Sequence, residues 1–166
     1  MSAKRDELVA ALRALERKHR AGTPLERRDA RAVLIPLGEL FLGTSGEAEL
    51  EGALAEVRAA VEPLEERWST LVASELALAC AEHIRSVDPR HLEHPLYDFA
   101  YTLAARSRLE ARLVGVRRLG LPLPRALVEE VERADRRLAP WLDRARAEGR
   151  LPDQRIQPPI KNRGNQ

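Results

Sequence analysis

Cysteine and aromatic residues are scarce in this 166-residue sequence, which contains one Cys, two Trp, two Tyr and two Phe. A single cysteine excludes an intramolecular disulfide framework. Aromatic and β-branched side chains favour strands, so their scarcity argues against a sheet. Long apolar runs are also missing. No stretch approaches the ~20 residues that span a bilayer, and the charged first twenty residues contain no signal-peptide core. We therefore expect a cytoplasmic protein with no membrane association.

The abundant residues are those that favour helices. Ala, Leu, Arg and Glu supply 95 of the 166 residues, and this blend of helix formers predicts an all-α fold. Arginine outnumbers lysine 25 to 3, a bias that suits bidentate ion pairs but that a GC-rich genome also produces. The formal net charge is only +2, so no overall field requires a nucleic acid or a membrane.

Start and stop signals divide the chain into a bundle of about five helices, which we place at residues 1–149. The expected helices cover residues 3–20, 23–43, 47–87, 95–119 and 124–148. The second is expected to start at a Thr23–Glu26 capping box and to bend or stop near Pro36. In the third, Pro63 either kinks one helix or separates two. Residues 150–166 are expected to form an extended or disordered basic tail.

The third predicted helix carries a long heptad-like seam. Its apolar residues follow a 4-3 spacing that predicts packing against another helix at a shallow angle: Leu50, Leu54, Val57, Val61, Leu64, Trp68 and Leu71. The seam is long for one small bundle to cover, so we expect self-association, as a homodimer.

Cys80, His83, His91 and His94 form a C-x₂-H-x₇-H-x₂-H pattern that resembles a set of zinc ligands. Structural zinc sites usually close small folds that lack a sufficient core, whereas this chain has ample apolar seams. We therefore interpret the stretch as the end of one helix, a proline-marked corner and the start of the next. Cys80 then acts as a small hydrophobe.

Carboxylates interrupt several apolar faces. Continuing the seam beyond Leu71 by the same spacing reaches Glu75 and Glu82, while Glu110 and Asp135 lie beside apolar residues of the last two helices. A buried carboxylate needs a partner, which can be a cation or a metal ion. A di-metal bundle requires two Glu-x-x-His motifs, and this chain has one. The favoured interpretation is pairing with arginines, or contact with a second subunit. The arginines expected to pair are ones such as Arg85, Arg106 or Arg117.

Function is indicated mainly by charge and by helix faces. The sequence contains no nucleophile elbow, P-loop or glycine-rich phosphate cradle. We expect a non-enzymatic, cofactor-free interaction or assembly protein that contacts a protein partner or a second copy of itself. The candidate contact residues are Arg150, Arg155, Lys161, Arg163, Tyr97 and Tyr101.

Two alternatives remain open. Residues 133–166 contain nine Lys and Arg against four Asp and Glu, so the basic C-terminal third could bind nucleic acid. A metal-dependent helical enzyme would instead use Glu75, Glu82, Glu110 and a histidine.

Overall fold

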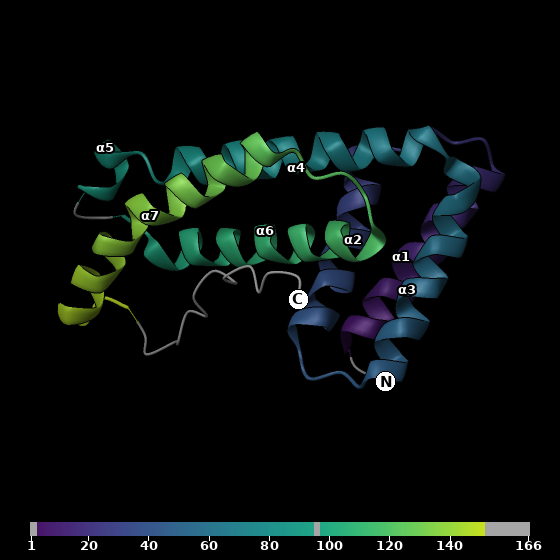
Figure 1. The fold of residues 1–166 in the computed structure, drawn as a ribbon, viewed down its shortest axis with the longest axis horizontal. Coiled ribbons are helices and arrows are strands. Elements are labelled where there is room, and N and C mark those ends of the chain that lie inside the picture. The colour runs from purple at the N-terminus through teal and green to yellow at the C-terminus, as the bar shows by residue number, and fades with distance from the viewer. Residues whose placement is uncertain (1–2, 95–96, 152–166) are drawn as a thin grey trace.

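The computed structural model describes residues 3–94 and 97–151, and every regular element in these ranges is helical, which confirms the all-α class. Figure 1 shows their arrangement. The elements are α1 (Ala3–Arg20), α2 (Arg27–Leu42), α3 (Glu47–Val61), the 3₁₀ turn η1 (Glu62–Leu64), α4 (Glu66–Ser86), α5 (Pro89–Leu92), α6 (Phe99–Leu119) and α7 (Arg125–Ala147). None of these helices combines the length and apolar character that crossing a bilayer requires.

The described residues form seven α-helices rather than about five, because two proline-containing segments interrupt the chain. Pro63 lies in η1, and Glu65 adopts a positive φ of 49° that separates α3 from α4. Asp88 starts the single turn α5, where its side chain accepts a hydrogen bond from the Arg90 backbone N–H at 2.9 Å. Proline supplies no N–H to a preceding turn, so both prolines mark the start of a new element.

Two predicted helix starts are wrong. The Thr23–Glu26 box does not form. Glu26 is instead the N-cap of α2, and Asp29 completes the capping box. Lys18 of α1 also binds Asp29, at 2.7 Å, so a contact between helices fixes this start. Helix α6 begins at Phe99 rather than at Pro95, because the Asp98 side chain accepts a hydrogen bond from the backbone N–H of Tyr101.

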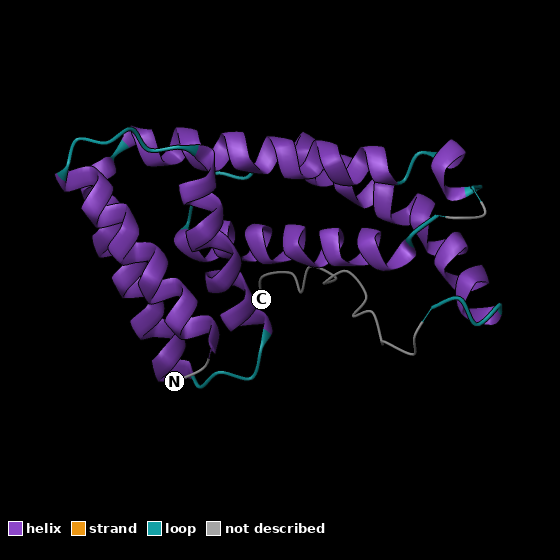
Figure 2. Ribbon diagram, turned by 180° about the vertical axis from the view of Figure 1, so that it is seen from behind, coloured by secondary structure: helices purple, strands orange, loops and turns teal. Residues whose placement is uncertain are grey.

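Helix α2 lies at the centre of the molecule and packs against α1, α4 and α6 (Figures 1 and 2). Its crossing with α6 brings the two backbones into contact. A Cβ atom on Gly38 would lie 1.8 Å from the carbonyl oxygen of Ala111, and one on Gly115 would lie 2.9 Å from that of Leu34. The distance between two packed helices depends on the side chains at the contact, and glycine permits this closest approach.

The buried apolar residues form two clusters. The larger one joins α1, α2, α3, η1, α4, the C-terminal half of α6 and the N-terminal half of α7, and it includes seam residues such as Val57 and Trp68. The smaller one lies where the end of α4, α5, the start of α6 and α7 meet. It consists of Val87, Leu92, Phe99, Ala134, Leu138, Leu142 and Ala145.

The glycine contact predicts a strongly position-dependent effect of adding one methyl group. Gly38→Ala should destabilise the fold by about 1–3 kcal/mol or more, because the added Cβ forces α2 and α6 apart. Gly52→Ala on α3 is the matched control. It meets nothing within 4 Å and should stabilise by up to about 1 kcal/mol through helix propensity. Urea unfolding followed by circular dichroism measures both, and similar values for the two variants would contradict the proposed crossing.

Candidate functional site

Glu75 of α4 is buried among arginines. Its side chain is 1% exposed, and its carboxylate lies 2.9 Å from Arg31 Nε, 2.8 Å from Arg112 Nε and 3.4 Å from Arg27 Nε. Arg112 comes from α6 and is almost buried, whereas the two α2 arginines are half-exposed. The expected arginine pairing is therefore confirmed for Glu75, with different arginines from those named as examples.

Glu82 is exposed, so its expected place on the buried face is wrong. The 4-3 spacing assumes 3.5 residues per turn, whereas a straight α-helix has 3.6 and drifts by about 20° per heptad. The buried face of α4 instead follows Trp68, Val72, Leu76, Ala79 and His83. His83 thus occupies the position that the extrapolation gave to its neighbour.

A second ionic cluster connects α4, α6 and α7 around Asp135. His83 Nε2 donates to Asp135 Oδ1 at 2.7 Å. Arg106 donates from Nε to both carboxylate oxygens at 2.9 Å and from a terminal nitrogen to Oδ2 at 2.8 Å. Its other terminal nitrogen binds Glu110 at 2.8 Å, which confirms the expected pairing of Glu110 with Arg106. A planar guanidinium with five N–H donors suits this double role.

The position of the Asp135 cluster explains its polarity. His83 on α4, Arg106 on α6 and Asp135 on α7 each lie along their helix between a residue of the larger apolar cluster and a residue of the smaller one. Burial opposes ionisation of Asp135, but the hydrogen bonds from His83 and Arg106 and the Arg106 charge outweigh it. The pKa of this carboxyl therefore lies below its ordinary value of 3.8. The carboxylate is charged and fully paired at neutral pH.

The structure does not assemble the zinc-like residues into a ligand set. Cys80 is 2% exposed, and burial raises the pKa of its thiol to about 11, which disfavours the thiolate that binds metals. His83 contacts Asp135, whereas exposed His91 donates from Nδ1 to the Arg85 carbonyl at 3.2 Å. Within residues 3–94 and 97–151, no three His, Cys, Asp or Glu side chains lie close enough together to hold a metal ion. The Glu75, Glu82 and Glu110 side chains likewise form no metal cluster within these ranges. His94 is the second residue after α5, which ends at Leu92.

The six residues expected to contact a partner lie in different environments. Tyr97 precedes α6 and is half-buried, with its hydroxyl donating to the Ser86 carbonyl and bonded to Thr102 Oγ1 at 2.6 Å. Tyr101 is 68% exposed and is free to make an external contact. Arg150 pairs with Glu148 and stacks over the Phe99 ring at 5.4 Å. The other three expected residues, Arg155, Lys161 and Arg163, lie outside the described residues.

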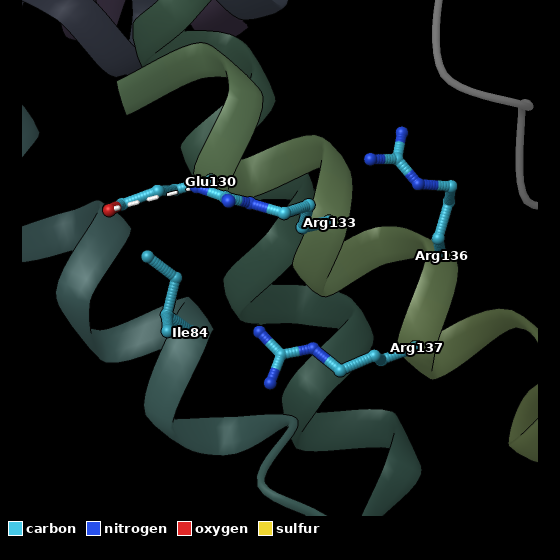
Figure 3. Close-up of a pocket in the computed structure, with 5 residues that line it drawn as sticks. All are labelled: Ile84, Glu130, Arg133, Arg136 and Arg137. Atoms are coloured by element: carbon cyan, nitrogen blue, oxygen red, sulfur yellow. Dashed lines mark ion pairs between the residues drawn. The ribbon is translucent and has the colours of Figure 1, made fainter. Parts of the chain in front are cut away.

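A groove lies between α4 and α7. It has a volume of about 620 Å³ and is lined by Ile84 from α4 and by Glu130, Arg133, Arg136 and Arg137 from α7. Figure 3 shows Ile84 facing α7, with Arg133 and Arg137 extending toward its side of the helix and Arg136 extending away. Arg133 makes a long 4.0 Å ion pair with Glu130, while Arg136 and Arg137 have no ion-pair partner among the described residues. Sequence reasoning noted the basic C-terminal third but did not single out these arginines.

Comparison of the chain with protein-family models, with curated proteins and with solved structures finds no match. The inferences about function therefore depend on the chemistry of the side chains.

The Glu75 cluster predicts unequal effects for two nearby glutamates of α4. Glu75→Ala should destabilise by about 3–5 kcal/mol, because it leaves the charge of Arg112 buried and uncompensated. Replacing both residues, as Glu75→Leu with Arg112→Leu, should cost less than the single change. Exposed Glu82→Ala is the control and should stay within about 0.5 kcal/mol. Equal urea midpoints for the Glu75 and Glu82 variants would show that Glu75 is not buried in this way.

The lowered pKa of Asp135 predicts a pH-dependent contribution to stability. Because the folded pKa lies below the unfolded value near 3.8, the stabilisation is fully present above that value and is lost as the pH falls through the folded pKa. Asp135→Asn should cost about 1.5–3 kcal/mol at pH 7, and its difference from wild type should shrink below pH 3.8. Exposed Asp143→Asn is the matched control on the same helix. A difference that does not change with pH in urea unfolding would contradict the assignment.

Proposed function

We propose that the protein is a non-enzymatic interaction protein that binds an acidic segment of a protein partner in the groove between α4 and α7. The observation that carries this proposal is the set of arginines at the groove, of which Arg137 extends toward the Ile84 side (Figure 3) and has no ion-pair partner among the described residues. An unpaired guanidinium at the surface is available for a bidentate contact with a carboxylate.

The residues that could have served catalysis are engaged inside the bundle. Glu75 is surrounded by three arginines, and His83 and Asp135 bind each other. Cys80 is a buried thiol with a raised pKa, which makes it a poor nucleophile. These side chains stabilise helix packing, and the groove itself is lined by residues that bind rather than react.

The lining favours a protein segment over other ligands. Four of the five lining residues are charged, so the groove offers several ionic contacts beside the apolar surface of Ile84 and of the arginine side-chain stems. Ile84 offers an apolar contact between the guanidinium groups, which suits an acidic helix with one apolar residue among its carboxylates. Glu130 in the same lining pairs with Arg133, which leaves the other two arginines of the groove to contact a carboxylate.

Nucleic acid is the second candidate, because residues 133–166 carry an excess of five positive charges. Phosphate binding by this region would give a steep dependence of affinity on salt concentration. The tail residues Arg155, Lys161 and Arg163 belong to this candidate, and they remain sequence predictions.

Fluorescence anisotropy with two labelled probes separates the two candidates. An acidic helical peptide with Glu and Leu at i, i+4 spacing should bind the wild type, and the Arg133→Glu/Arg137→Glu variant should bind it at least about tenfold more weakly. Arg17→Glu/Arg20→Glu on exposed positions of α1 is the control with the same change in charge, and it should bind like the wild type. Binding of single-stranded DNA with a steep salt slope, and no binding of the peptide, would replace the proposal with the second candidate. Binding of neither probe would refute both.

A further inference from the structure

An acidic surface lies on α3 and the adjoining start of α4. Residues 45–70 contain seven Glu and two Arg, a net charge of −5 over 26 residues. Their exposed glutamates with no ion-pair partner within the described chain are Glu47, Glu51, Glu62, Glu65 and Glu66. The protein thus has unpaired carboxylates on one surface and unpaired guanidinium groups in the groove.

The two surfaces cannot meet within one molecule. Figures 1 and 2 show α3 at one end of the fold and α7 running toward the other. The tail is a poor occupant for the groove on charge grounds, since residues 152–166 contain three Lys and Arg against one Asp. Neither of these two segments can therefore fill the groove of its own molecule, whereas the acidic surface of another chain is free to do so.

We infer that the groove between α4 and α7 binds the acidic face of α3 from a second copy of this chain. This inference rests on the proposed function and names the partner. It is supported by charge complementarity and by matching spacing, because Glu47 and Glu51 lie one helical turn apart, as do Arg133 and Arg137.

The surface of α3 is compatible with close contact. Ala48 and Ala55 are exposed beside the glutamates, and neither would obstruct an approach to Ile84 in the groove. Glu47 and Glu51 lie on α3, and Glu62 follows in η1 directly after the helix, so exposed carboxylates occur from the start of α3 to beyond its C-terminal end.

The contact joins two different surfaces, so one such contact leaves a groove and an acidic face free in the pair. These two free surfaces either meet each other in a closed two-fold dimer or bind further copies to form rings or open chains. Exposed ion pairs contribute little each and are screened beyond about 10 Å at 0.1 M salt. The association is therefore weak and sensitive to salt.

Sedimentation velocity at low salt tests the inference with two half-blocked variants. Arg133→Gln/Arg137→Gln disables the groove, and Glu47→Gln/Glu51→Gln disables the acidic face. Wild-type protein should give a mass that increases with concentration and decreases on addition of salt. Each variant alone should associate at least about tenfold more weakly than the wild type. An equimolar mixture should form a one-to-one dimer and nothing larger, because only one intact groove and one intact face meet.

Arg17→Gln/Arg20→Gln is the control and should associate like the wild type. Wild-type protein that stays monomeric up to about 1 mM would overturn the inference, as would association that survives in either half-blocked variant. If the wild type stays monomeric while the acidic helical peptide binds the groove, the second-copy inference fails and the proposed function stands. If the wild type does not bind the peptide and self-association survives in the Arg133→Gln/Arg137→Gln variant, both the proposed function and the second-copy inference fail.

Discussion

The backbone contact between α2 and α6 determines where the other parts of the molecule lie. Gly38 contacts the backbone of Ala111, and Gly115 contacts that of Leu34, so each helix supplies the glycine that the other requires. Arg112 follows Ala111 directly, and Arg31 precedes Leu34 by one helical turn. The same close approach therefore places one arginine from each helix beside Glu75 of α4. The close packing of α2 on α6 thus positions the two arginines, and the buried Glu75 carboxylate joins α4 to both helices.

The Asp135 cluster connects this central part to α7. Asp135 contacts both α4 and α6 through His83 and Arg106, so the register of α7 on its neighbours depends on a charged side chain with two partners. At 100° per residue, Asp135 lies about 180° around α7 from the midpoint of Arg133 and Arg137. An inward contact of Asp135 consequently directs these two arginines outward, where they line the groove. The internal ionic cluster and the external basic surface are two consequences of the same orientation of one helix.

Much of the helical framework could be predicted from the sequence, because its signals are local. The first helix has the expected bounds of Ala3–Arg20, and the expected end of another at Gly120 coincides with a left-handed φ of +72°. Two predicted starts were wrong because other possible N-terminal signals lie close by in the sequence. The capping box of α2 uses Glu26 and Asp29 rather than Thr23, and α6 is capped by Asp98 rather than starting at Pro95. Pro63 was ambiguous between a kink and a break, since proline excludes a hydrogen bond without dictating the next residue's conformation.

The candidate site was predictable only in part. A glutamate on an apolar face shows that a cation must lie nearby, but the partners of Glu75 are 44 and 37 residues away along the chain, and 25 arginines could have supplied them. Glu82 was misplaced because the buried face of a straight α-helix drifts by about 20° per heptad relative to a 4-3 sequence repeat. This error is small over one heptad and becomes large when the repeat is extended over several.

The two uses of arginine also differ chemically, which bears on the bias of 25 to 3 over lysine. Arg106 binds Asp135 with two nitrogens and Glu110 with the third, a geometry that the single ammonium of lysine cannot reproduce. At the groove, by contrast, a carboxylate partner in water could be bound by either cation. Codon bias alone would favour arginine equally at buried and at exposed positions, whereas the geometry of the buried cluster specifically requires arginine. The buried cluster thus gives a structural reason for arginine at particular positions. The groove arginines matter for a different reason, which is that Arg136 and Arg137 have no ion-pair partner among the described residues.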